Sequence, residues 1–228
     1  MRWKWLIVGL IILAAAGGAA WWMVPVYQEG RIDGRELLVS ALKNTASTQS
    51  FRYELESYLT VEGRKEVISK VEGEKSSEGN IHIKGEMVKT PVNIYHFKQS
   101  IFNWDSFAKR WLVINDAQSN STKVLISELD PLSNFNFKNI GEVKKEGFET
   151  IDGSKCMIIC CRPSVENELM EILWQDFTYK IWIDVNERVI KKTALSAVSK
   201  NNSNTFLSLK VTFKDYNSQI KIDKPNVE

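Results

Sequence analysis

The segment FRYELESYLTV, residues 51–61, decides the fold class, because large apolar side chains alternate along it with charged or polar ones. Its first apolar residues are Phe51, Tyr53 and Leu55, and the residues between them are charged. Successive side chains of a β-strand point to opposite faces, so a period of two indicates a strand with one buried face. The segment therefore predicts a half-buried β-strand.

The same alternation recurs through the C-terminal part of the chain. It predicts further strands over residues 67–71, 81–87, 92–98, 101–104, 110–115, 143–151, 155–161, 179–185, 189–199 and 207–213. Asp152-Gly153 is the strongest hairpin signal. Residues 155–161 are apolar on both faces, which predicts a central, covered strand. Short connections and one-sided alternation together indicate roughly ten antiparallel strands in a single curved sheet.

Few helices interrupt these strands. Residues 34–47 have apolar residues at helical spacing, and Asp33 precedes them as an N-cap candidate. Ser164 is the N-cap candidate of a second expected helix over residues 165–177. Residues 123–132 also have helix-like spacing. The body of the chain is therefore predicted to be α+β.

The N-terminus predicts a membrane anchor. Residues 5–24 contain no charged side chain, and a helix of this length spans roughly 30 Å, the thickness of a bilayer core. Arg2 and Lys4 precede the run. Positive charge is retained on the cytoplasmic side, so we expect a cytoplasmic N-terminus and an extracytoplasmic body.

A cleaved signal peptide is the competing interpretation, because small residues at 14–16 and 18–20 suit a signal peptidase. The apolar run is longer than an ordinary signal-peptide core, which favours a retained segment. Both interpretations place the body outside the cytoplasm. We therefore divide the chain into residues 1–27, a membrane anchor or uncleaved signal sequence with the start of a linker, and residues 28–228, the extracytoplasmic domain.

Charge argues against nucleic acid as a partner. The chain has 228 residues and a formal net charge of +2. The excess lies in residues 1–27, which hold Arg2, Lys4 and no acidic residue, so the remaining body is neutral. A neutral body has no general attraction to a polyphosphate backbone.

Metal and cofactor sites are not expected. His82 and His96 have no paired ligand spacing, and His82 lies on a polar strand face where we expect it to be solvated. Residues four apart on a strand are too far apart for a disulfide, and neighbouring residues point to opposite faces. Cys156, Cys160 and Cys161 are therefore expected to be small buried side chains, with an intermolecular or redox thiol as the alternative.

Catalytic motifs are also missing, so we do not expect an enzyme. The sequence contains no G-x-S-x-G, no phosphate-binding loop and no dinucleotide-binding glycine motif. Glu54 and Glu56 are interpreted as members of a solvated strand face and not as a catalytic pair. No catalytic residue, metal ligand or cofactor is predicted.

Several segments, in this order, resemble the LolA/LppX/RseB-like lipoprotein-carrier superfamily over about residues 33–225. They are the helix RELLVSALKNT at 35–45, SFRYEL at 50–55, a hairpin with Trp111, GFETIDGSKC at 147–156, YKIWID at 179–184 and a closing strand that ends near Pro225. The resemblance implies an unclosed half-barrel sheet with helices in its concavity. In that superfamily the cavity holds acyl chains, or the domain serves as a sensor that binds partners.

The apolar strand faces supply the candidate ligand cavity. Its candidate residues are Phe51, Tyr53, Leu55, Leu59, Ile81, Ile83, Met87, Tyr95, Phe97, Trp111, Ile181, Ile183, Leu209, Val211 and Phe213. An ordinary closed core would use the same residues. We therefore expect a membrane-tethered, non-catalytic domain that binds a lipid or lipidated polypeptide. A cell-envelope sensor or scaffold with a protein partner is the alternative.

Overall fold

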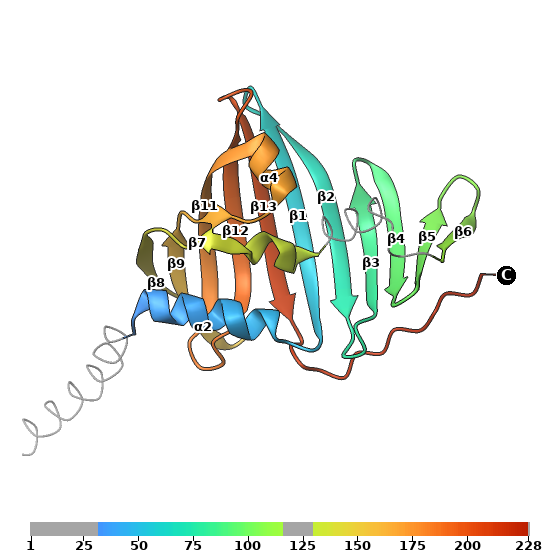
Figure 1. Cartoon of the computed structure of the whole chain (residues 1–228), viewed down its shortest axis with the longest axis horizontal. Coiled ribbons are helices and arrows are strands. Elements are labelled where there is room, and N and C mark those ends of the chain that lie inside the picture. Colours follow the sequence, from blue (N-terminus) through green and yellow to red (C-terminus); the bar gives the residue numbers. More distant parts are fainter. Residues whose placement is uncertain (1–31, 116–129, 228) are drawn as a thin grey trace, which may run out of the picture.

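The computed structural model describes residues 32–115 and 130–227, and its main element is an eleven-stranded sheet (Figure 1). Every neighbouring pair of strands is antiparallel, and the order is β6-β5-β4-β3-β2-β1-β13-β12-β11-β9-β8. These strands are β1 Phe51–Val61, β2 Arg64–Lys75, β3 Ile81–Met87, β4 Thr90–Phe97, β5 Ser100–Asp105, β6 Arg110–Ile114, β8 Val143–Ile151, β9 Ser154–Cys161, β11 Trp174–Asp184, β12 Ile190–Ser199 and β13 Thr205–Lys214.

The sheet is curved and not closed. Its edge strands β6 and β8 are not paired with each other, so the sheet has two edges (Figure 1). This confirms the predicted unclosed, mostly antiparallel sheet with few helices. The Asp152-Gly153 hairpin is confirmed too, because β8 and β9 pair up to Ile151 and Ser154 on either side of it.

Helix α2 (Gly34–Ala46) lies across one face of the sheet, over strands β8 to β13 (Figure 1). It begins where predicted, because the Asp33 side chain accepts a hydrogen bond from the backbone N–H of Glu36 at 2.9 Å. Leu37, Leu38 and Ala41 are buried against the sheet. The amphipathic pattern of this segment therefore decides both its helical form and the face that it covers.

A second layer of short elements crosses the same face. It consists of the 3-10 helix η1 (Pro131–Phe135), the two-stranded sheet of β7 (Phe137–Asn139) and β10 (Ser164–Val165), and the short helix α4 (Glu168–Leu173). Figure 1 shows them above α2 over the same strands. Strands β3 to β6 extend beyond this cover as a separate wing of the sheet.

The predicted helix over residues 165–177 is wrong. Val165 pairs with Phe137 in the small sheet, α4 begins only after Asn167, and Trp174 already pairs with Ser199 in the main sheet. Both pairings are with residues remote in sequence, and they override the local helical spacing. The Asn167 side chain, and not that of Ser164, caps the helix by accepting from the N–H of Met170.

The strand over residues 155–161 is paired on both sides, but it is not central. Strand β9 lies second from the edge, between β11 and β8. Cys156, Met157 and Ile159 are nevertheless buried, so both of its faces bear contacts, as the sequence indicates.

Two expectations fall outside the described residues. They are the membrane-spanning segment 5–24 and most of the helix-like segment 123–132. Within residues 32–115 and 130–227, no helix has both the length and the apolar character needed to cross a bilayer.

Candidate functional site

The strand register places twelve of the fifteen candidate cavity residues on one face of the sheet. Leu55 is opposite Val211 and Val71, and the register continues from there to the neighbouring strands. These twelve residues are Phe51, Tyr53, Leu55, Leu59, Ile81, Ile83, Met87, Ile181, Ile183, Leu209, Val211 and Phe213. We call this surface the inner face, and it is the face that α2 covers.

Tyr95, Phe97 and Trp111 do not belong to this face, so their assignment to the cavity is corrected. Tyr95 is opposite His82 and its ring is 5.6 Å from that of Trp111, whereas Ile94, the next residue, is opposite Ile83 of the inner face. The three rings therefore lie on the outer face of β4 and β6. Because both faces of β4 and β6 carry large apolar residues, the sequence pattern does not reveal which side chains point toward the inner face.

Side chains of the second layer, formed by η1, β7, β10 and α4, pack onto the inner face where this layer crosses it. Phe135 of η1 packs against Phe213 with ring centroids 6.0 Å apart, and Phe137 of β7 packs edge-on against Tyr179 at 4.9 Å. The Tyr179 hydroxyl donates to the backbone oxygen of Asn134 at 2.7 Å. The cover is therefore fastened to the sheet by aromatic packing and a buried hydrogen bond.

An opening lies between α2 and η1. It is a cavity of about 310 Å³, at the lower end of the size range of small-molecule sites, roughly 300–1,000 Å³. Its lining residues are Leu42, Thr45, Ala46, Asp130, Leu132, Ser133, Phe135, Asn136 and Ile190. We call this cavity the α2–η1 pocket. Its apolar side chains continue into the core of the inner face, since Phe135 and Ile190 belong to that core.

Asp130 is the polar residue of the α2–η1 pocket that sequence reasoning missed. Its carboxylate accepts from the N–H of Leu132 at 2.9 Å and so caps η1. Burial raises the pKa of Asp130 above its ordinary value, although the Leu132 N–H and the positive charge of Lys75 act in the opposite direction. The Asp130-Pro131 pair was the available signal, because Asp is a common cap before a first-turn proline.

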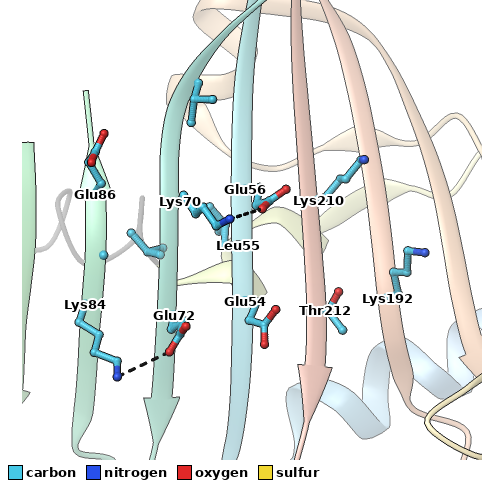
Figure 2. A pocket seen from close by; sticks show the side chains of 13 residues that line it. Glu54, Leu55, Glu56, Lys70, Glu72, Lys84, Glu86, Lys192, Lys210 and Thr212 are labelled. Atoms are coloured by element: carbon cyan, nitrogen blue, oxygen red, sulfur yellow. Dashed lines mark ion pairs between the residues drawn. The ribbon is translucent and has the colours of Figure 1, made fainter. Parts of the chain in front are cut away.

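The outer face of β12, β13, β1, β2 and β3 is hollowed, with a cavity of about 830 Å³ lined mostly by charged side chains (Figure 2). Lys70 pairs with Glu56 at 3.3 Å and Lys84 with Glu72 at 3.6 Å, across neighbouring strands. These exposed pairs each contribute at most about 1 kcal/mol to stability. We call this surface the outer hollow.

Glu54 and Glu56 lie in the outer hollow, and each carboxylate has a lysine beside it. Glu54 accepts from the Lys214 ammonium at 2.6 Å. A hydrogen bond from the Tyr58 hydroxyl, followed by the bond from Lys70, lowers the pKa of Glu56 despite its partial burial. The lowered pKa of Glu56 is the opposite of what a general acid needs.

His82 is not solvated as predicted. Its ring stacks on Tyr95 with centroids 3.9 Å apart, and its Nε2 lies 3.0 Å from the Asn93 side-chain oxygen. The Tyr95 ring of β4 covers the His82 ring. The alternation of residues along β3 could not reveal this contact with the neighbouring strand. His96 lies on the other face of β4, where burial lowers its pKa. In the described part of the chain, no three His, Cys, Asp or Glu side chains gather to hold a metal ion.

The three cysteines are free thiols. Cys156 and Cys161 are buried and Cys160 is partly buried. Burial raises the pKa to about 11 for Cys156, about 11 for Cys160 and about 12 for Cys161. The thiols are therefore protonated at neutral pH, which suits small packed side chains and not reactive nucleophiles.

Two solved structures are similar to this chain over most of their length. The lipoprotein LppX of Mycobacterium tuberculosis superposes with a TM-score of 0.54 at 13% sequence identity, over 84% of this chain and 100% of LppX. LprF of Mycobacterium bovis has a TM-score of 0.53 at 10% identity, over 84% of this chain and 96% of LprF. No protein-family model and no curated protein sequence matches the chain. The expected resemblance is thus confirmed as a likeness of fold to LppX and LprF.

Proposed function

We propose that this chain is a membrane-tethered, extracytoplasmic binding domain that holds an acyl chain of a lipid or lipidated polypeptide under α2. The α2–η1 pocket is the observation that carries this proposal, because it opens from the surface onto the apolar core of the inner face. The shared fold with LppX and LprF supports a domain of this kind. No covalent bond is made or broken, so the domain is proposed to be non-catalytic.

Binding would occur by burial of the acyl chain. Leu42 and Ala46 of α2 would contact it on one side, and Leu132 and Phe135 on the other. Each methylene removed from water contributes roughly 0.8 kcal/mol, so a partly buried chain supplies useful affinity. Next to the pocket the Phe135 ring packs against Phe213, so a longer chain would have to displace Phe135.

The tether is the second part of the proposal, and it rests on residues 5–24. Their uncharged run, preceded by Arg2 and Lys4, supports a single span with a cytoplasmic N-terminus. A tethered domain would stay near the membrane from which its ligand comes.

The pocket is tested by filling it. Ala46 is an exposed residue of the pocket lining, so Ala46→Trp should block the mouth without entering the packed core. Val39, another exposed residue of α2, offers a matched control that does not line the pocket. In the full chain in detergent, we expect uptake of a fluorescent fatty acid to fall at least tenfold in Ala46→Trp and to be unchanged in Val39→Trp.

Equal uptake by the two variants would contradict the pocket. Absence of uptake by the parent chain would contradict lipid binding altogether. In that case the alternative, an envelope sensor or scaffold, gains support from the outer hollow, whose charged lining offers many contacts to a protein partner.

A further inference from the structure

Two neighbouring hairpins of the wing formed by β3 to β6 carry exposed apolar residues at their tips. Val88 lies at the β3–β4 turn with 66% of its surface exposed, and Phe107 lies at the β5–β6 turn with 92% exposed. A basic residue follows each of them closely, namely Lys89 in the first turn and Lys109 in the second. A tip of this composition is unusual for a turn, where polar residues normally face water.

The two tips lie at the same end of the sheet. Because β3, β4, β5 and β6 are successive antiparallel neighbours, the turns after β3 and after β5 point in the same direction (Figure 1). The register places them at a similar height, since Met87 pairs with Thr90 and Ile94 with Asn103. Two strand spacings separate the tips, which is roughly 10 Å.

The β3–β4 turn retains its apolar residue at a cost in stability. Val88 and Lys89 have φ angles of 48° and 60°. Both lie in the left-handed region, where Asn and Gly are favoured and a β-branched residue is strained. The hairpin would be more stable with Asn at position 88, so the exposed valine does not serve the stability of the turn.

The residues around Phe107 suit contact with a surface that has both apolar and charged parts. The Asp105 carboxylate accepts from the N–H groups of Phe107 and Ala108, both at 2.9 Å, and so fixes the turn. Trp104 and Trp111 pair directly behind the tip, with ring centroids 5.3 Å apart. Indole rings favour the headgroup layer of a bilayer.

We propose that these two tips dock on an anionic lipid bilayer, with Val88 and Phe107 inserted among the headgroups. The positive charges of Lys89, Lys109 and Arg110 complement anionic headgroups. The two tips protrude separately from the same end of the sheet. This arrangement fits a deformable apolar layer better than a shaped pocket on a protein. This docking is independent of the α2–η1 pocket, since the two surfaces share no residue.

Docking is tested on the full chain in proteoliposomes, with a fluorescent label at Ala108→Cys. Cys160→Ser serves as the background, because Cys160 is the least buried thiol. We expect quenching of this label by spin-labelled lipid in vesicles that contain phosphatidylglycerol, and much less in phosphatidylcholine alone. A label at Val39→Cys on α2 should remain unquenched in both.

Two variants connect the quenching to the tips. Phe107→Ser should lower the ratio of docked to undocked protein about tenfold, because the transfer of one phenyl side chain is lost. Val88→Asn should lower it too while raising the thermal stability of the chain, so misfolding could not explain the loss. Fatty-acid uptake should be unchanged in both variants. Equal quenching in the two vesicle types, no quenching, or quenching that Phe107→Ser leaves intact would overturn the proposal.

Discussion

Asp130 is the residue whose ionisation bears most directly on the pocket. A partly buried carboxyl with a raised pKa binds more protons in the folded state than in the unfolded one. The stability of the chain is therefore expected to fall as pH rises from the ordinary Asp pKa, about 3.9, through the raised value. Burial destabilises the charged form of Asp130, and the hydrogen bond from the Leu132 N–H partly offsets this cost.

Asp130→Asn tests this cost. Asn keeps the ability to cap η1 but carries no charge, so the variant should unfold at higher urea concentration than the parent chain at pH 7. The difference should shrink as the pH falls toward 4, where the parent carboxyl is protonated. Urea unfolding of both full-length proteins at the two pH values checks this. A difference that does not vary with pH would contradict the assignment.

Strands β1 and β2 depend on a glycine where they cross the centre of the inner face. Gly73 is opposite Tyr53, and a Cβ atom on Gly73 would lie 2.2 Å from the Tyr53 ring. The Tyr53 ring is buried and packs against the backbone of Gly73, which has no side chain. The glycine thus makes room for an aromatic side chain on the neighbouring strand.

Gly73→Ala should destabilise the chain by about 1–3 kcal/mol, the usual cost of overpacking a core. Chemical unfolding monitored by tryptophan fluorescence measures the change. In a Tyr53→Leu background the same substitution should cost clearly less, because the atoms it meets are gone. Additive effects of the two substitutions would show that the ring contact is not the cause.

Most elements could be predicted because their patterns are local. Helix α2 and the hairpin at Asp152-Gly153 follow from capping and turn residues within a few positions. The helix over residues 165–177 was mispredicted because its residues pair with Phe137 and Ser199, far away in sequence. The α2–η1 pocket could not be predicted, because it is formed by α2, the η1 segment and Ile190 of β12, which are far apart in sequence and are brought together only by tertiary packing.

The candidate inner face was predictable in part for a related reason. Period-two alternation gives the direction of side chains reliably in β1 and β13, where the opposite face is mostly polar or charged. In β4 and β6 both faces are apolar, so Tyr95 and Trp111 were assigned to the wrong one. Alternation fails where the second face of a sheet has its own apolar surface, as the wing does.

At the scale of the whole molecule, the proposal requires a single span with the sheet outside the cytoplasm. A C-terminal fusion of the full chain to alkaline phosphatase, which is active only outside the cytoplasm, should be active in bacterial cells. The same fusion to chain lacking residues 1–27 should be inactive. Mass analysis of the fusion's N-terminal peptide should recover residues 1–27, whereas their loss from the mature protein would indicate a cleaved signal peptide. An active fusion without these residues would contradict the tether.

The most direct test of the central claim is native mass spectrometry of the full chain, released from its own membranes in detergent, followed by lipid extraction. We expect a stoichiometric lipid or lipidated species on the parent chain, its loss in Ala46→Trp and its retention in Val39→Trp. A parent chain that carries no such mass, or an equal mass on Ala46→Trp, would contradict an acyl-chain site between α2 and η1.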